Sequence, residues 1–157
     1  MMAWDVRSAT AADLETIVDF NQQMALDTEG KALERSILEP GVRRALTEPG
    51  LARYFVVEDD EGGAPTVVGQ LMLTEEWSDW RNGRFLWIQS VYVAPSHRRR
   101  GVYQALHRQV EELAKQQGDV CGIRLYVEVD NEVAKRTYER LGMSACAYRM
   151  YEQLLER

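Results

Sequence analysis

One segment of the chain combines a strand, a basic turn and a helix in immediate succession. Residues 85–93 form a nearly continuous apolar run, which predicts a strand covered on both faces. Pro95 closes this run, and three consecutive arginines and Gly101 follow. Apolar residues then recur on one side of a helix expected over residues 101–117, which Gly118 ends. A strand that leads directly into a helix in this way points to an α/β or α+β fold.

The remaining elements complete this fold class. Further helices are expected over residues 10–26, 33–46 and 131–141, and further strands over residues 5–7, 54–58, 66–74, 123–129 and 143–151. A polar and aromatic loop is expected over residues 77–83. With 157 residues the chain has the usual length of one domain, so residues 1–157 are predicted to form a single domain around a mixed sheet.

Charge is distributed unevenly along the chain. The net charge is −6, yet residues 80–110 contain no aspartate or glutamate and six arginines. A compact cationic patch on an acidic protein favours a small polyanionic ligand over a nucleic acid. The alternative interpretation is an ordinary solvated run of charge.

Several functional classes are disfavoured. No apolar stretch is long enough to span a membrane, and the first residues lack the apolar run of a signal peptide. Cys121 and Cys146 are too few for a disulfide framework, and both fall in expected strands, where buried thiols are expected. His97 and His107 are expected at the surface or on a helix without ligand partners, so no metal site is predicted. We therefore expect a cytoplasmic protein that acts on neither membranes nor nucleic acids.

The turn at Gly101 has the features of an anion site. A helix N-terminus offers unpaired N–H groups and a partial positive charge, and glycine lets a ligand approach the backbone closely. The arginines add charge-assisted hydrogen bonds. Neither a Gly-Lys-Ser/Thr triplet nor a G-x-G-x-x-G pattern occurs, so the turn favours a diphosphate over a nucleoside triphosphate.

Two motifs carry a resemblance to a known family. Arg98 and Gly101 occupy the first and fourth positions of an R-x-x-G-x-G/A pattern, whose sixth position here is Tyr103. Residues 131–143 match N-x-x-A-x-x-x-Y-x-x-x-G-F except at the last position, where Met143 replaces phenylalanine. In type, order and spacing the two motifs resemble those of the GNAT-type N-acetyltransferase superfamily. The resemblance covers essentially the whole chain and is strongest from Phe85 onward.

The resemblance implies a fold and a set of contacts to acetyl-CoA. The expected sheet is mixed, mostly antiparallel and splayed in a V, and about four helices flank it. The N–H of Val91 would polarise the thioester carbonyl, and Tyr103 must direct its side chain away from the diphosphate. The full set of implied contacts is Val91, Tyr92, Val93, Arg98, Arg99, Arg100, Gly101, Val102, Tyr103, Gln104, Asn131, Ala134 and Tyr138.

The implied reaction is direct attack of an amine on the thioester, which needs no nucleophilic side chain. The resemblance places Tyr138 near the sulfur, and a phenol with a pKa of about 10 can protonate a thiolate whose thiol has a pKa of about 8.5. The general base is open, because several relatives carry a glutamate on the central strand where this chain has Trp87. The candidates are Glu29, Glu75, Glu76 and Glu128, or a water relay without a single base.

The resemblance also locates the acceptor pocket, which the first two helices and the loops opposite the donor would form. Aromatic side chains beside carboxylates would hold a cationic amine, unless the tryptophans only pack a loop onto the sheet. The candidate acceptor residues are Asp27, Glu29, Trp77, Trp80, Trp87, Gln89 and Glu128.

The sequence therefore predicts an acetyl-CoA-dependent N-acetyltransferase that acts on a primary amine of a small molecule or peptide. The alternative is a non-catalytic acyl-CoA-binding regulatory module, which the missing strand glutamate favours and which Asn131 and Tyr138 disfavour. A nucleic-acid-binding domain that uses residues 98–100 is a third interpretation, and the acidic composition disfavours it. The resemblance implies a monomer or a homodimer.

Overall fold

The computed structural model describes residues 4–157, which divide into two compact units, one ending at Tyr126 and the other spanning Val127–Arg157. The elements of the first unit are β1 (Asp5–Ser8), the short 3-10 helix η1 (Ala11–Asp13), α1 (Leu14–Glu29), α2 (Arg35–Thr47), β2 (Arg53–Asp59), β3 (Thr66–Ser78), β4 (Gly83–Val93), the 3-10 helix η2 (Pro95–His97), α3 (Val102–Gln117) and β5 (Val120–Leu125). The second unit contains α4 (Glu132–Arg140).

The five strands form one sheet in the order β1-β2-β3-β4-β5. The first three pairs are antiparallel, and only β4 and β5 run parallel, so the expected mixed and mostly antiparallel sheet is confirmed. β5 pairs with β4 only from Arg84 to Ile88, whereas β4 continues to Val93. The edge of β4 that faces β5 is therefore left without a paired strand from Gln89 onward, among the residues that the structure describes.

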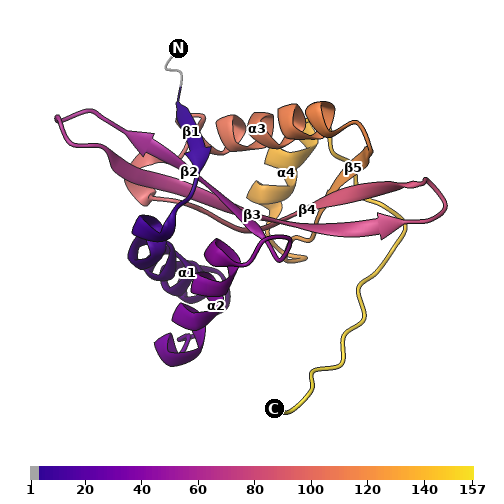
Figure 1. Cartoon of the computed structure of the whole chain (residues 1–157), viewed down its shortest axis with the longest axis horizontal. Coiled ribbons are helices and arrows are strands. Elements are labelled where there is room, and N and C mark those ends of the chain that lie inside the picture. The colour runs from indigo at the N-terminus through magenta and orange to yellow at the C-terminus, as the bar shows by residue number, and fades with distance from the viewer. Residues whose placement is uncertain (1–3) are drawn as a thin grey trace. The chain divides into compact units, whose positions relative to one another are not determined.

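Helices cover both faces of this sheet, as Figure 1 shows, with α1 and α2 on one face and α3 on the other. α3 buries the side on which the sequence places its apolar residues, including Leu106 and Val110, against Leu71 and Leu86 of the sheet. Gly69 of β3 permits this approach, because a Cβ at this position would lie 2.7 Å from Cγ1 of Val102. The opposite face packs a second core, which contains Ile17, Val18, Val42, Tyr54 and Val56.

An ion pair fixes the entry into α1. The Arg7 guanidinium donates to both carboxylate oxygens of Asp13, at 2.8 and 2.9 Å, and the backbone N–H of Thr10 donates to the same carboxylate at 2.8 Å. Thr10 and Asp13 together form a capping box at the start of this helical segment. The hydrogen bond from Arg7 holds the pKa of the Asp13 carboxyl below its usual value of 3.8.

Asp13→Asn is expected to lower the free energy of unfolding by about 1–3 kcal/mol at neutral pH, because Arg7 loses one of its two charged partners and keeps only Glu58. A carboxyl whose pKa is depressed by folding stabilises the native state above about pH 4, and this contribution is lost as the pH falls further. The difference between wild type and variant should therefore narrow in acid. Urea unfolding at about pH 7 and about pH 3 measures this difference in the free energy of unfolding. The exposed Asp19→Asn is the control, and an equal effect of both variants would contradict the assignment.

Four sequence predictions about this fold are wrong. β3 extends to Ser78 and β4 begins at Gly83, so the loop expected at residues 77–83 is shorter and spans only residues 79–82, because the antiparallel register continues to Ser78 opposite Gly83. β5 ends at Leu125 rather than 129, where the chain leaves β4. Residues 143–151 form no strand: alternation alone does not make one without a paired neighbour, and residues 144–157 are exposed. Cys121 and Cys146 are exposed rather than buried, because they lie on the edge strand β5 and in this segment.

Candidate functional site

The turn between β4 and α3 presents the start of α3 without a side-chain cap. Arg99 and Gly101 both have left-handed backbone conformations, with φ of +61° and +82°, and Gly101 directly precedes the first helical residue. Within residues 4–157 no side chain caps this end of α3, and its first turn contains no acidic residue. Within the described residues, the N–H groups of the first turn therefore lack the capping hydrogen bond, and their partial positive charge lacks the acidic neighbour, that helix N-termini usually have.

The arginines of this turn differ in what they contact. Nε of Arg98 donates to the carbonyl of Val93 at 2.9 Å, and its guanidinium lies over the ring of Tyr92 and 3.7 Å from the carboxylate of Asp27. Arg98 therefore joins the end of β4 to α1. Arg99, by contrast, forms no ion pair within residues 4–157.

Contacts from other elements hold the same turn from its outer side. Nε1 of Trp4 donates to the carbonyl of Arg100 at 2.8 Å, and the Arg100 guanidinium lies 5.3 Å from the Trp4 ring centroid. Nε2 of His97 lies 2.6 Å from the Asp59 carboxylate at the end of β2. The backbone conformation of the turn is thus set before any ligand binds.

A pocket of about 780 Å³ opens at this turn, between β1 and α3. It is lined by four of the predicted donor contacts, namely Arg99, Arg100, Gly101 and Gln104, together with Trp4 and Arg108. Val91, Tyr92 and Val93 do not line it. Tyr103 does not either: its hydroxyl lies 3.2 Å from Nδ1 of His107, one turn further along α3, so its side chain leaves the N-terminus open as expected. His107 is buried, and burial lowers its pKa.

A β-bulge interrupts β4 where it separates from β5. Gln70 pairs with Tyr92, but Met72 pairs with Gln89, so Leu71 of β3 faces both Ser90 and Val91. Ser90 has a left-handed conformation with φ of +51°, which costs a residue other than glycine about 1–3 kcal/mol. A bulge of this kind leaves one residue outside the hydrogen-bond ladder of the sheet.

Three buried polar side chains surround this bulge. Nε2 of Gln70 donates to the carbonyl of Ser90 at 3.0 Å, and the Tyr54 hydroxyl hydrogen-bonds with the side chains of Ser90 and Asn21. Burial raises the pKa of Tyr54, so the phenol stays protonated at neutral pH. This network was not predicted from the sequence. The available signals were a glutamine and a serine inside otherwise apolar strands.

The outer part of the β3–β4 hairpin carries four of the seven predicted acceptor residues. Trp87 and Gln89 lie on one face of β4, where the Trp87 indole donates to Glu76 at 3.1 Å and Gln89 donates to Thr74 at 2.7 Å. Trp77 and Trp80 are 59% and 86% exposed at the end of the hairpin. The Trp87 side chain is therefore held on the sheet by its hydrogen bond to Glu76, whereas the Trp80 side chain is exposed to solvent.

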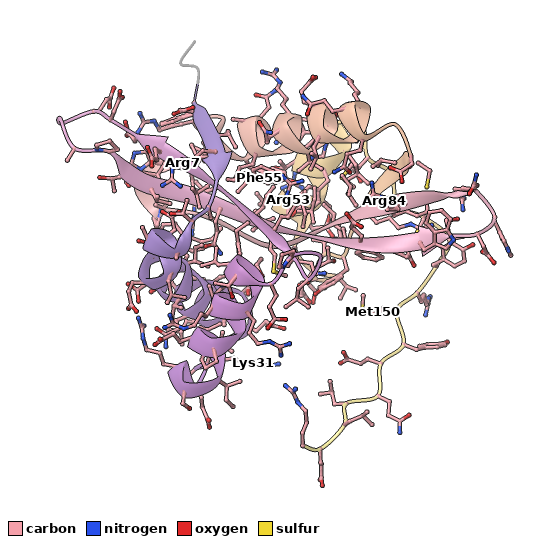
Figure 2. The ribbon with its side chains drawn as sticks, viewed as in Figure 1. Arg7, Lys31, Arg53, Phe55, Arg84 and Met150 are labelled. Carbon is pink, nitrogen blue, oxygen red and sulfur yellow. The ribbon has the colours of Figure 1, made fainter. Side chains whose placement is uncertain are left out.

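The carboxylates proposed as general bases differ in their partners. Glu75 pairs with Arg84 at 2.7 Å (Figure 2 labels Arg84), and Glu76 pairs with Arg124 at 2.7 Å. Hydrogen bonds from Arg124 and Trp87 lower the pKa of Glu76, which makes it a weaker base. Asp27 and Glu29 lie in the last turn of α1 and are exposed.

The second unit contains the remaining predicted residues. Oδ1 of Asn131 accepts a hydrogen bond from the backbone N–H of Ala134 at 3.1 Å, which confirms Asn131 as the N-cap of α4. Tyr138 is half-buried on α4, and burial raises its pKa above the usual value of 10.0. Glu128 is exposed, and its carboxylate accepts from the N–H of Asp130. The roles of these residues toward an acyl donor stay predictions.

Among residues 4–157, none of the helices has the combination of length and apolar character that crossing a bilayer requires. In the same part of the chain, no three His, Cys, Asp or Glu side chains gather where they could hold a metal ion.

Comparison with known proteins identifies the family. The model of the acetyltransferase (GNAT) family matches residues 15–143. A solved structure described as a possible acetyltransferase from Clostridium difficile 630 shares 42% identity, covers 99% of this chain and 100% of its own, and has a TM-score of 0.88. The glucosamine-6-phosphate N-acetyltransferase of Arabidopsis thaliana shares the fold, with 17% identity, a TM-score of 0.72, and coverage of 97% and 99%. The chain therefore belongs to the GNAT family of acetyltransferases.

Proposed function

We propose that the protein transfers an acetyl group from acetyl-CoA to a primary amine of a small molecule or a peptide. The observation that carries this proposal is the uncapped N-terminus of α3 behind Gly101, which follows the bulged strand β4 in the chain after the short 3-10 helix η2. The N-terminus of α3 suits a diphosphate. The bulged strand suits an acyl group, because a bulge leaves backbone amides outside the hydrogen-bond ladder. The family match over residues 15–143 supports the same activity.

The residues of the turn fit acetyl-CoA. Backbone N–H groups of residues 99–104 would bind the diphosphate, and Arg99 would add a charge that no ion pair within the described residues neutralises. The backbone of Val91 and Val93 would bind the pantetheine arm along the edge of β4 that β5 leaves unpaired. Asn131 and Ala134 would contribute from α4. Acetyl-CoA supplies the acetyl group as a thioester, which an amine can attack directly.

Tyr138 would act as the general acid. As the neutral amine forms the new C–N bond, the C–S bond breaks, and Tyr138 donates its phenolic proton to the departing sulfur and regains one from water. The raised pKa keeps Tyr138 protonated throughout the neutral range, so the donor form is always present.

Water is the proposed acceptor of the amine protons. Arg84 and Arg124 neutralise Glu75 and Glu76, and Trp87 occupies the position where several relatives carry a glutamate. Glu29 and Glu128 are exposed and could only act through intervening water. We therefore propose that a chain of water molecules, connected to the solvent, accepts the amine protons in place of a single general base.

A non-catalytic acyl-CoA-binding module is the second candidate, and the tryptophan at position 87 is the observation that favours it. Both candidates bind acetyl-CoA, so only turnover separates them. In either case we propose one cytoplasmic domain over residues 1–157, monomeric or homodimeric, that needs no metal and binds neither nucleic acid nor membranes.

A thiol-release assay with acetyl-CoA and a panel of amines tests the proposed function. The panel contains amino acids, polyamines, peptide N-termini and amino sugars, the last because the Arabidopsis structure is that of an enzyme named for one. Release of CoA with one amine class, matched by acetylated amine in the mass spectrum, is the expected result. Binding of acetyl-CoA without release with any amine would favour the regulatory module.

Trp80→Ala and Trp87→Ala are expected to raise the KM for the amine about tenfold, because a cation–π contact contributes about 0.5–2 kcal/mol. The Kd for acetyl-CoA should stay unchanged, since both tryptophans lie outside the α3 turn. Steady-state kinetics and calorimetry measure the two constants. An unchanged KM would assign these tryptophans to packing alone.

A further inference from the structure

The buried amide of Gln70 is unusual because it packs no better than an apolar side chain of the same volume would. Gln70 is 0% exposed, and within residues 4–157 its Oε1 accepts no hydrogen bond. A methionine or leucine would fill the same volume without leaving a buried acceptor unpaired. The one hydrogen bond that the side chain makes goes from Nε2 to the carbonyl of Ser90, at the β-bulge of β4.

That hydrogen bond fixes the orientation of one peptide group. The carbonyl of Ser90 and the N–H of Val91 belong to the same peptide, which is trans, like every peptide bond of the described residues. In a planar trans peptide the C=O and N–H bonds point in opposite directions. Because Nε2 of Gln70 holds the Ser90 carbonyl, the Val91 N–H points away from the Gln70 amide. Val91 itself lies in the part of β4 that β5 leaves unpaired.

The conformation held in this way is one that serine does not favour. At φ of +51°, Ser90 lies in the left-handed region, in which glycine is the only residue without a steric cost. The hydrogen bonds from Gln70 and with Tyr54 offset this cost. Without them, the backbone at Ser90 is expected to relax and the Val91 N–H to change direction.

We propose that Gln70 is a positioning residue, which holds Ser90 in its left-handed conformation and thereby directs the Val91 N–H at the carbonyl oxygen of the bound acetyl group. The inference rests on the acetyl-CoA-dependent function proposed above and assigns a role within it to a residue that touches no substrate. It predicts that removal of the Gln70 amide weakens polarisation of the acetyl carbonyl and leaves the affinity for CoA, which lacks that carbonyl, unchanged.

The direct measurement is the infrared frequency of the thioester carbonyl in acetyl-CoA labelled with ¹³C at that carbon. Bound to the wild type, this carbonyl should absorb at a lower frequency than in solution, because a hydrogen bond polarises it. In Gln70→Met the shift should largely disappear, and turnover should fall at least about tenfold, a part of the 10²–10³-fold that loss of one oxyanion donor costs. Met72→Leu, a volume-conserving change on the same face of β3, is the control for repacking and should keep the shift.

Rescue at Ser90 separates positioning from packing. Glycine adopts positive φ without strain. Gln70→Met combined with Ser90→Gly should therefore have a turnover at least about threefold higher than Gln70→Met alone, and should regain part of the carbonyl shift. Ser90→Ala in the same background removes the hydroxyl but keeps the strain, and should recover neither. Equal recovery with both substitutions would overturn the proposal.

Other outcomes are equally decisive. A Gln70→Met protein that folds and keeps both the carbonyl shift and the turnover overturns the proposal. If this variant does not fold, Gln70→Asn replaces it, since a shorter amide cannot reach the Ser90 carbonyl and should give the same losses. A wild type that binds acetyl-CoA without a carbonyl shift also overturns the proposal, whereas a wild type that binds no acetyl-CoA contradicts the proposed function itself.

Discussion

Tyr138→Phe is expected to lower kcat about 10²–10³-fold while leaving the Kd for acetyl-CoA unchanged. The substitution removes one oxygen from a half-buried ring and keeps its apolar contacts, so binding and stability should change little. What is lost is the proton that the departing sulfur requires. Burial raises the pKa of Tyr138 above 10.0, so ionisation of this group should cause no loss of wild-type activity below about pH 10.

Steady-state kinetics with the best amine, together with calorimetric titration of acetyl-CoA, provides the two constants. Tyr151→Phe is the matched control, because it makes the same change at a tyrosine that is 94% exposed in the same unit. Equal kcat values for wild type and Tyr138→Phe would remove Tyr138 from the chemistry. A parallel loss of kcat and acetyl-CoA affinity would assign it to binding.

Gly101→Glu is expected to raise the Kd for acetyl-CoA at least about 100-fold, because a carboxylate at the positive end of α3 repels the diphosphate. Space is not the obstacle, since a Cβ at Gly101 would meet its nearest neighbours, in Gln104 and Trp4, only at 3.9 Å. The φ of +82° strains any side chain at this position, so the charge must be separated from the strain.

Two controls make that separation. Gly101→Asn introduces an uncharged side chain that tolerates the left-handed region, and should weaken acetyl-CoA binding far less than Gly101→Glu does. Gly118→Glu places the same charge and similar strain, at φ of +73°, at the opposite end of α3. It should destabilise the fold without changing the acetyl-CoA affinity. An unchanged Kd for Gly101→Glu in calorimetry would mean that the diphosphate does not bind at this turn.

Features determined by local sequence were predictable. Asn131 as the cap of α4, Gly30 and Gly118 at helix ends, and the apolar stripe of α3 all depend on residues a few positions apart. The strand–turn–helix unit at β4 and α3 was predictable for the same reason. So was the direction of Tyr103, since a large side chain beside the anion site could only leave it open by pointing along the helix.

Features that depend on distant partners were not predictable from one sequence. The bulge at Ser90 arises from the register between β3 and β4, and its support comes from Tyr54 and Gln70, which lie on other strands. The contacts of the Arg98 guanidinium with Val93 and Asp27 also depend on the fold, and its predicted contact with the cofactor stays a prediction. The strand expected at residues 143–151 has the right alternation, but a strand also requires a neighbour that alternation does not specify.

Thermal unfolding with and without acetyl-CoA tests the central claim most directly. A ligand that binds only the native state adds about 2.7 kcal/mol at 100 times its Kd, so acetyl-CoA should raise the Tm clearly in the wild type. The same concentration should raise it little in Gly101→Glu and fully in Gly118→Glu. Absence of any shift in the wild type at saturating acetyl-CoA would contradict the assignment of the α3 turn and the function built on it.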